Sequence, residues 1–495
     1  MHLKRSLGHH VIAVAVAALV AAGCSNDRIT ETRRLTPDAL PAANLGMGQP
    51  YVVNVSRDTT AQNETPVAVN PLNSANLITG NNDWNYNDGC GVNASFDGGK
   101  TWTPTLPNGF VPGITKYTDD PAVPGTGAYD FGGDPAVAFG PDGTAYFACF
   151  GYQATPPFGV VLLLSRSTDG GRTWLRGGSA QPLTLVTAFQ GNGKARGSTG
   201  QFPDHDAIHV AADGTIYMTW AQFTGQSAHS PVYIATSTDG GQSFGLPVAV
   251  TSGSVRNNQD QRVVTDARGT AYLTFDNSIQ GGKGTAMYVS TSANHGVSWS
   301  APMQFGTFQN PICVYPPYCF NISGGQFRGP GSYPVPAVDP TRNRLYVAYT
   351  DIIGTRAQVL LTYASLSDLT HWSTPQVVAP GAGDRINVEM SVEPASGRID
   401  LMANDRSWTN NALFDVTYLT SADGGQTWSV QRITKTSWDP SQYGVPNGSG
   451  IRPFIGDYDG IVSLPTSVGM TWTGPGKTYG ALPTNLDVYF GKVAF

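Results

Sequence analysis

The chain has 495 residues, of which 13% are charged, and its formal net charge is −6 at pH 7. So few basic residues exclude an extended nucleic-acid surface, and we expect no nucleic-acid partner. The 59 glycines and 35 prolines supply many turn formers, which favours an all-β protein with short strands.

The N-terminus predicts export. An apolar run at residues 11–20 follows Lys4 and Arg5 and is too short for a membrane span, which is typical of a secretory signal. The sequence Leu-Val-Ala-Ala-Gly-Cys-Ser at residues 19–25 resembles a bacterial lipobox, which implies a signal peptide of residues 1–23 and a lipid on Cys24. The alternative is an ordinary cleaved signal without lipid. Residues 24–49 then form a polar, flexible stalk. We expect a lipoprotein in the periplasm or at the cell surface, in contact with the membrane through its lipid alone.

One short pattern then recurs along the chain. Residues 95–102, 167–174, 237–244 and 421–428 read Ser-x-Asp-Gly-Gly-x-Ser/Thr-aromatic, residues 292–299 carry Asn294 in place of Asp, and residues 365–372 are a looser copy. The Asp carboxylate can accept backbone N–H groups of its own turn, and the glycines allow the positive φ that a tight reversal needs. Each copy therefore predicts a hairpin turn in which the Asp has a structural role.

These six copies resemble the Asp-box, or BNR, repeat of the sialidase-like β-propellers. The resemblance implies a ring of four-stranded blades. It implies activity less directly, because Asp-box propellers include sialidases, other glycosidases and proteins without catalysis.

A second repeat interleaves with the first. Seven strand pairs, such as residues 134–139 with 143–148 and 206–211 with 214–220, precede or follow the turns. The seventh unit has a third strand at residues 485–490 and then ends, and residues 51–56 alternate correctly for its missing outer strand. We predict one propeller domain at residues 50–495, with seven blades closed by the N-terminal strand. Six blades is the alternative, because sialidases themselves have six.

The remaining cysteines fit an oxidising compartment. Cys313 and Cys319 stand six residues apart in a proline-rich loop and are expected to pair, which leaves Cys90 and Cys149 to pair across neighbouring repeats. No Cys/His spacing typical of a zinc site is present in the sequence.

Arginines and carboxylates gather in the loops that lead into the inner strands. In a propeller these loops lie on one face, opposite the Asp-box turns. One interpretation is a channel mouth that binds an acidic sugar and cleaves its glycosidic bond. The other is that these charges pair with each other and join adjacent blades. The residues concerned are Asp134, Arg196, Asp204, Asp206, Arg256, Asp260, Arg262, Arg328, Asp384, Arg385, Glu389, Arg452, Asp457, Tyr458 and Asp459.

The sialidase resemblance implies three arginines on the substrate carboxylate, an Asp acid, and a Tyr nucleophile with a Glu partner. Asp134 matches the acid, and Glu389 with Tyr458 or Tyr443 matches the pair. The arginines are Arg328, Arg385 and Arg452. Arg328 lies in Phe-Arg-Gly-Pro at residues 327–330, which resembles the family's Phe-Arg-Ile-Pro motif, although that motif belongs near the start of the propeller.

Two further patterns could bind a metal. Residues 83–89 alternate oxygen ligands as a calcium loop does, but the glycine comes one place late and Ala94 stands where a Glu is expected. We therefore expect no cofactor, with calcium as the alternative. On a regular strand, His205 and His209 point away from Asp204 and Asp206, which predicts structural histidines.

Two functions follow from the sequence. The first is a surface-anchored, sialidase-like glycoside hydrolase, expected to be monomeric, that acts on exposed and in particular acidic glycans. The alternative is a non-catalytic Asp-box propeller that binds glycan or protein at the cell envelope.

Overall fold

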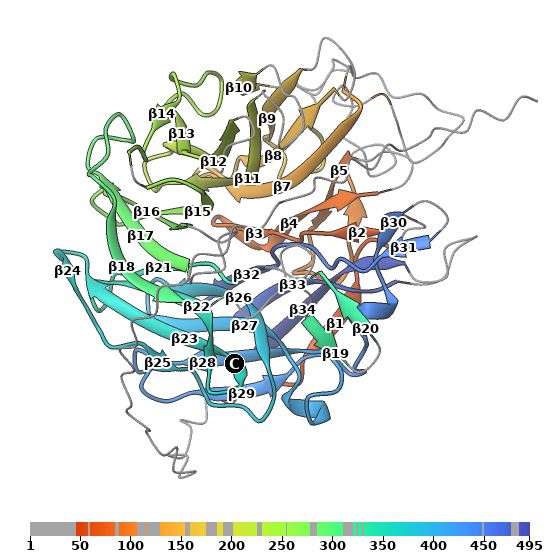
Figure 1. The fold of residues 1–495 in the computed structure, drawn as a ribbon. Coiled ribbons are helices and arrows are strands. Elements are labelled where there is room, and N and C mark those ends of the chain that lie inside the picture. Colours follow the sequence, from red (N-terminus) through yellow and green to blue (C-terminus); the bar gives the residue numbers. More distant parts are fainter. Residues whose placement is uncertain are drawn as a thin grey trace, which may run out of the picture. The chain divides into compact units, whose positions relative to one another are not determined.

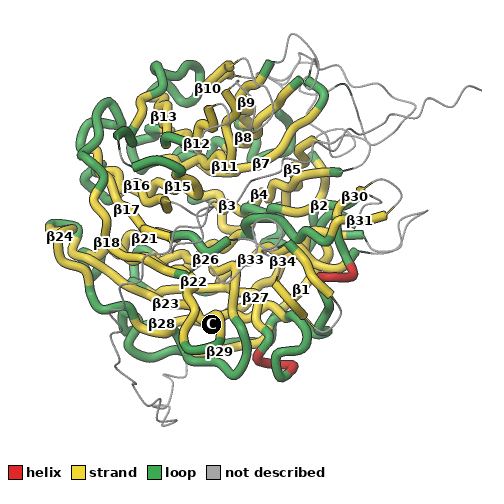
Figure 2. Tube along the Cα trace, in the orientation of Figure 1, coloured by secondary structure: helices red, strands yellow, loops and turns green. Residues whose placement is uncertain are grey.

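The computed structural model describes residues 46–57, 60–84, 89–105, 116, 129–153, 159–174, 186–191, 201–224, 230–253, 255–277, 285–309, 320–322, 325–328, 331–447, 450–476 and 485–495. In these ranges helix is confined to the short 3-10 turns η3 (Ser407–Thr409) and η4 (Pro440–Gln442), and strands dominate (Figure 2). No helix within them is long and apolar enough to cross a membrane. The predicted signal peptide, Cys24, Arg196, Cys313 and Cys319 lie outside the described residues.

Seven antiparallel sheets, blades 1 to 7, succeed one another along the chain (Figure 1). Blade 1 contains β2 (Gln62–Asn63), β3 (Val67–Asn70), β4 (Asn73–Asp83), β5 (Gly89–Ser95) and β6 (Thr103–Pro104). Blade 2 contains β7 (Phe131–Phe139), β8 (Ala145–Tyr152), β9 (Val160–Ser167) and β10 (Val186–Gly191). Blade 3 contains β11 (Gln201–Val210), β12 (Ile216–Thr224), β13 (Val232–Ser237) and β14 (Val248–Ala249). Blade 4 contains β15 (Asn258–Thr265), β16 (Ala271–Asn277), β17 (Thr285–Ser292) and β18 (Met303–Phe308).

The second half of the chain repeats this order. Blade 5 contains β21 (Val335–Asp339), β22 (Arg344–Ile353), β23 (Arg356–Ser365), β24 (Asp368–Trp372) and β25 (Gln376–Val377). Blade 6 contains β26 (Arg385–Glu393), β27 (Arg398–Asp405), β28 (Asp415–Ser421) and β29 (Ser429–Arg432). Blade 7 contains β32 (Gly460–Leu464), β33 (Ser467–Pro475), β34 (Leu486–Ala494) and, from the other end of the chain, β1 (Tyr51–Asn54). Two hairpins stand apart from the blades, β19 (Phe320–Ile322) with β20 (Gly325–Phe327) and β30 (Val445–Asn447) with β31 (Gly450–Arg452).

The blades form a closed ring. Each inner strand contacts the inner strands of both neighbouring blades, and β3 of blade 1 contacts β32 of blade 7. The N-terminal strand β1 pairs with β34, with Tyr51 opposite Lys492 and Asn54 opposite Tyr489, so red and blue strands meet in Figure 1. The prediction of an all-β propeller with seven blades and an N-terminal closing strand is therefore confirmed, and the six-bladed alternative is wrong.

The predicted box turns have the expected hydrogen bonds. In the first, Gly99 N–H donates to Ser95 Oγ at 2.9 Å, and Thr101 donates its N–H to Asp97 Oδ1 at 2.9 Å and its hydroxyl to Oδ2 at 2.6 Å. Burial raises the pKa of Asp97, but the hydrogen bonds from Thr101 and Ser95 outweigh it, and the pKa is lowered overall. The carboxylate thus accepts backbone N–H groups that have no backbone acceptor in this tight turn.

The same turns join neighbouring blades. Gly99 has φ +89°, and a Cβ on it would lie 2.1 Å from a ring carbon of Phe490 in blade 7. Gly171 has φ +90°, and a Cβ there would lie 2.8 Å from Ile78 in blade 1. The second glycine of the box is therefore required twice, for its backbone angle and for close packing against the preceding blade.

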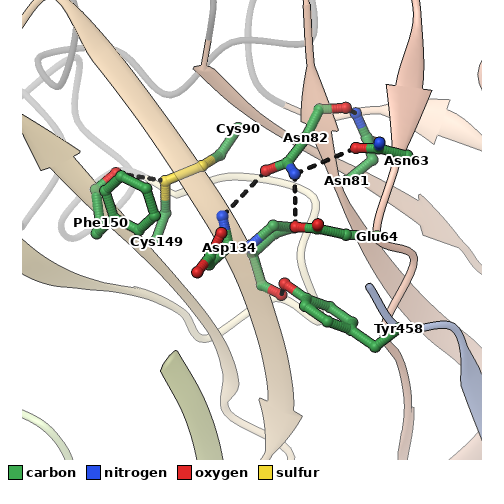
Figure 3. The surroundings of a disulfide bond; sticks show 10 residues. Asn63, Glu64, Asn81, Asn82, Cys90, Asp134, Cys149, Phe150 and Tyr458 are labelled. Carbon is green, nitrogen blue, oxygen red and sulfur yellow. Dashed lines mark hydrogen bonds between the residues drawn. A yellow bond between two sulfur atoms is a disulfide. The ribbon is translucent and has the colours of Figure 1, made fainter. Parts of the chain in front are cut away.

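The core lies between the blades. One apolar cluster includes Ile78 and Val92 of blade 1 together with Val137 and Phe147 of blade 2. The disulfide Cys90–Cys149 joins β5 to β8 across the same interface, with a Cα–Cα distance of 6.6 Å, and this is the pairing expected for the two cysteines (Figure 3). Blades 1 and 2 are thus held together both by packing and by a covalent bond.

Contact with the ring begins just before the predicted domain boundary. Gly48 N–H donates to the carbonyl oxygen of Ala494 at 2.8 Å, and the side-chain amide of Gln431 donates to the carbonyl oxygen of Gly48 at 2.9 Å. The last residues assigned to the stalk therefore pack on blades 6 and 7.

Candidate active site in the central channel

An irregularity recurs where the inner strands begin. The register of β7, β11, β15 and β26 shifts at residues 134–135, 205–206, 260–261 and 387–388, and each bulge starts with a polar residue in the left-handed region. These residues are Asp134 (φ 53°), His205 (φ 55°), Asp260 (φ 57°) and Asn387 (φ 52°). Glu64, just before β3, has φ 58°. A bulge turns side chains out of strict alternation, and such strain concentrates at functional sites.

The bulges of β7 and β11, together with Glu64, line two consecutive cavities. The first, which we call the mouth cavity, has a volume of about 230 Å³. Its charged lining residues are Glu64, Asp83, Asp134, Asp204, Asp457, Arg328 and Arg452. Its aromatic lining residues are Trp84, Phe131, Phe150, Tyr152, Phe202 and Phe454. The cavity therefore combines carboxyl groups, guanidinium groups and ring faces in one small space.

Asn82 holds two of the acids in place (Figure 3). Its Nδ2 donates to Glu64 Oε2 at 2.5 Å, while its Oδ1 accepts the N–H of Asp134 at 3.0 Å. Asp134 Oδ2 accepts the N–H of His205 at 2.6 Å. Blade 1 thus holds the backbone of Asp134, and blade 3 holds its carboxyl group.

The electrostatics of the acids differ. Burial, followed by the charge of Asp204, raises the pKa of Asp134 to about 7. Burial, followed by the charges of Asp134 and Asp457, raises the pKa of Glu64 well above its usual value. Asp457, by contrast, forms an ion pair with Arg328, with Oδ2 at 2.7 Å from Nη2. The cavity therefore holds proton donors beside an ion-paired carboxylate.

Backbone pairing brings Arg328 to this place. Its N–H donates to the carbonyl oxygen of Pro453 at 2.8 Å, so the segment before blade 5 runs beside the segment before blade 7. The Arg328 guanidinium lies 3.9 Å from the ring centroid of Phe454, and that of Arg452 lies 5.6 Å from the same centroid. Stacking on one ring orients both cations toward the mouth cavity.

The second cavity, the inner cavity, has a volume of about 170 Å³ and follows further along the same inner strands. Arg262 of blade 4 pairs with Glu389 of blade 6 through two bonds of 3.0 and 2.9 Å, and the Tyr333 hydroxyl donates to Glu389 at 2.9 Å. Tyr458 donates instead to the carbonyl oxygen of Pro135 at 2.9 Å. Burial, followed by the charges of Glu64 and Asp134, raises the pKa of Tyr458 well above its usual value, so its hydroxyl stays protonated.

The structure thus places most of the site residues predicted from the sequence in two different cavities. Asp134, Arg328 and Arg452 line the mouth cavity, whereas Glu389 and Tyr458 line the inner cavity. The tyrosine that contacts Glu389 is Tyr333, because the loop before β21 carries it there, while Tyr443 packs against Trp438 at 5.6 Å.

Arg385 lines neither cavity. Its Nε donates to Asp405 Oδ2 at 2.8 Å, Nη1 donates to the carbonyl oxygens of Val378 and Ala379, and the side chain is buried. The expectation that Arg385 joins Arg328 and Arg452 at one site is therefore corrected, because Arg385 is used within blade 6 and its interface. Arg398–Asp400 and Arg406–Asp384 are further ion pairs of this structural kind.

Regular strand alternation also misplaced His205. Because of the bulge, His205 and Asp206 both line the inner cavity, and His205 Nδ1 lies 2.8 Å from Asp260 Oδ1 in blade 4. His209 is hydrogen-bonded to Thr265 at 2.8 Å, and burial lowers its pKa to about 4.

Of the calcium-like loop, residues 85–88 lie outside the described part of the chain. Asp83 accepts hydrogen bonds from Thr60 and Gln62. Among the described residues, no group of three or more His, Cys, Asp or Glu side chains is placed to hold a metal ion.

Glu64 and the aromatic lining residues of the mouth cavity are not among the site residues predicted from the sequence. Glu64 shares the left-handed conformation of Asp134, but aligning the strand repeats on Pro66 and Pro135 places Thr65 opposite Asp134, so the sequence repeat does not reveal Glu64. The aromatic residues come from blades 1, 2 and 3 and from the segment before blade 7, and no local pattern joins them.

Neither a family model nor a curated protein matches the sequence. Among solved structures, a polysaccharide lyase of family 25, an ulvan lyase, has a TM-score of 0.50 at 11% identity over 88% of this chain and 95% of that chain, and it was also solved bound to -[GlcA(1-4)Rha3S]-. A protein of unknown function from Dyadobacter fermentans has a TM-score of 0.46 at 13% identity, over 91% of this chain and 100% of that chain. An α-L-arabinofuranosidase from Fusarium graminearum has a TM-score of 0.41 at 12% identity, over 72% of this chain and 91% of that chain. At these identities the chain is similar to the ulvan lyase in its fold.

Proposed function

We propose that the protein is a sialidase-like glycoside hydrolase that cleaves exposed glycans in the mouth cavity. One observation carries the proposal, the convergence of carboxyl groups, two arginines and six aromatic rings on a single cavity of about 230 Å³. Glycan-cleaving sites need these three elements for proton transfer, polar recognition and stacking.

Binding is divided between the walls of the cavity. The faces of Trp84, Tyr152 and Phe202 offer apolar surface to the C–H faces of sugar rings. Arg328 and Arg452 offer N–H donors to sugar hydroxyls or to the carboxylate of an acidic sugar. An acidic glycan would therefore place its carboxylate against the Phe454 side of the cavity.

Asp134 and Asp457 perform the chemistry. Because its pKa is raised to about 7, about half of Asp134 is protonated at pH 7, and this form donates its proton to the glycosidic oxygen as the bond breaks. Asp457, held in its ion pair with Arg328, presents a carboxylate to the developing positive charge at the anomeric carbon, and a water molecule adds to this carbon to complete the hydrolysis. The charges of Asp134 and Asp457 add to burial in raising the pKa of Glu64 well above its usual value.

The cellular location of this activity is also a proposal. The lipobox-like sequence at residues 19–25 supports export and a lipid on Cys24, and the polar stretch that follows supports a tether. A monomer on a lipid anchor would present the channel mouth to surrounding glycans.

A screen of the purified protein on fluorogenic glycosides tests the proposal. Sialosides come first, and uronides and neutral pentosides and hexosides follow. The substrate that is turned over should lose at least about 100-fold in kcat with Asp134→Asn, since general acid catalysis contributes roughly 10²–10⁴-fold. Asn keeps an acceptor for the His205 N–H, so the fold should be retained.

Asp142→Asn is the matched control, because Asp142 lies in the exposed β7–β8 turn of the same blade and should leave turnover unchanged. Turnover that survives Asp134→Asn would refute the role of Asp134.

The second candidate function is a non-catalytic glycan- or protein-binding propeller. The observation that favours it is that several channel charges already pair, as Arg262 does with Glu389 and Arg328 with Asp457. No turnover on any glycoside, together with glycan-array binding that Trp84→Ala abolishes, would establish this candidate instead.

A further inference from the structure

The inner cavity has a polar end and an apolar end. Its polar end is formed by His205, Asp206, Arg262, Glu389, Tyr458 and Asp459. Its apolar wall is formed by Val67, Val137, Ile208, Met390 and Ile461. A volume of about 170 Å³ is small for a drug-sized ligand, which needs at least about 300 Å³. The cavity therefore suits a short amphiphilic molecule.

Asp206 is the unusual member of this lining. It is 2% exposed, and neither carboxyl oxygen has a hydrogen-bond partner within the described part of the chain. Buried carboxyl groups are normally paired because an unpartnered one costs free energy. An orphaned carboxyl group beside an open volume indicates that its partner is a ligand.

The charge of the lining indicates the sign of that ligand. The charge of Arg262 is matched by Glu389 at 2.9 Å. Asp459 is held by neutral donors, Thr65 and the N–H of Thr473 at 3.1 Å and Asn387 at 2.6 Å. Among the residues that line the cavity, Asp206 and Asp459 therefore remain without a matching cation.

The pKa values of Asp206 and Asp459 agree with the lack of a matching cation. Burial, followed by the charge of Asp134, raises the pKa of Asp206 well above its usual value. Burial raises the pKa of Asp459 to about 8. Without a cation, Asp459 therefore holds its proton at pH 7, and the raised pKa of Asp206 favours its protonated form.

We propose that the inner cavity binds a small organic cation, a primary ammonium group on a short apolar chain, with Asp206 as its ion-pair partner. The ammonium group would lie at the polar end and the chain would lie along the apolar wall. A divalent metal ion fits less well, because the described residues provide no group of three or more metal-binding side chains. This site uses residues other than Asp134 and Asp457, so it does not rest on the proposed hydrolase activity.

Titration calorimetry with butylammonium chloride tests the proposal, with 1-butanol and sodium butyrate as neutral and anionic ligands of the same length. Butylammonium should bind and the other two should not. Because the raised pKa of Asp206 favours its protonated form and an ammonium group favours the carboxylate, binding should release protons, which two buffers of different ionisation enthalpy reveal. The affinity for butylammonium should therefore rise as the pH is raised from 5 to 7, because the ammonium group pairs with the ionised form of Asp206.

Two variants complete the design. Asp206→Asn should remove both binding and proton release, and it breaks no hydrogen bond of the described structure. Asp213→Asn, in the exposed β11–β12 turn of the same blade, should bind butylammonium as the wild type does. The charged and titratable groups near Asp206 that also influence the pH profile are Asp134, Asp204, His205, Asp260, Arg262, Glu389, Tyr458 and Asp459.

Three results would overturn the proposal. The first is equal binding of 1-butanol, which would make the cavity merely apolar. The second is stabilisation by calcium chloride alone, which would indicate a metal site. The third is butylammonium binding without proton release or unchanged by Asp206→Asn, which would place the cation elsewhere.

Discussion

Asp134 shows how a single carboxyl group acquires a function from its surroundings. The left-handed bulge turns it into the mouth cavity, the His205 N–H fixes one oxygen, and burial keeps its proton. The charge of Asp204 adds to the effect of burial. The acid and the group that tunes it thus lie on the inner strands of neighbouring blades, β7 and β11.

A pH–rate profile measures this tuning. A general acid must be protonated, so kcat/KM should be constant below the Asp134 pKa of about 7 and should fall about tenfold per unit above it. Asp204→Asn removes a negative charge that raises this pKa, so the alkaline limb should move to lower pH by about 0.5–1 unit. A limb that stays in place in the variant would contradict the assignment of Asp134 as the acid.

At the scale of the element, two local structures repeat around the ring, a bulge and a box turn, and they lie at opposite ends of the strands. The bulge at the start of the inner strand turns polar groups toward the channel, and the box turn between third and outer strands joins the blade to its neighbour. In the box turn of blade 4, Asn294 takes the place of the Asp. Its side-chain oxygen accepts the Ser298 N–H at 3.0 Å, and its side-chain N–H donates to the Ser298 hydroxyl at 2.9 Å. The turn therefore needs an acceptor at this position more than it needs a charge.

The substitutions Asp97→Asn and Asp97→Ala separate acceptor from charge. Asn keeps an oxygen for the Thr101 N–H and should change the free energy of unfolding by less than about 0.5 kcal/mol at pH 7. Ala removes that acceptor, as loss of a helix cap does, and should cost about 1–2 kcal/mol.

Urea unfolding at pH 7 measures the change in the free energy of unfolding for both Asp97 variants. In the wild type the lowered pKa of Asp97 contributes stability that is lost as pH falls below about 4, whereas the Asn variant lacks this loss. Equal stability of the Ala and Asn variants would show that the turn forms without the side chain.

At the scale of the whole molecule, stability depends on closing the ring. Strand β1 covers the edge of β34, and the two ends of the chain thereby share blade 7. An uncovered β34 would expose unpaired backbone groups along an edge that readily pairs with another chain.

Two truncations test this closure. A protein that begins at residue 46 keeps β1 and should melt as the full chain does, whereas one that begins at residue 58 lacks β1 and should melt at least about 5 °C lower and aggregate. Differential scanning calorimetry and light scattering provide the two readouts. Equal melting of both truncations would mean that β1 adds nothing to the ring.

The sequence by itself determined the architecture. Turn residues act locally, so Ser, Asp, Gly and an aromatic at fixed spacing specify a hairpin wherever they occur, and their count against the strand pairs predicted seven blades and the β1 closure. The grouping of Asp134, Arg328 and Arg452 at the channel mouth also followed from the order of strands, because loops of one type must lie on one face.

Only the tertiary structure decided which charges share a site. Arg328 and Asp457 are 129 residues apart and Arg262 and Glu389 are 127 apart, and ring closure rather than local sequence makes them partners. The bulges shift the alternation by one residue, so they moved His205 and Asp206 into the channel against the strand pattern. Arg385 and Arg328 look alike in the sequence, and only the burial of one with Asp405 and the exposure of the other to a cavity separate a structural arginine from one that can meet a ligand.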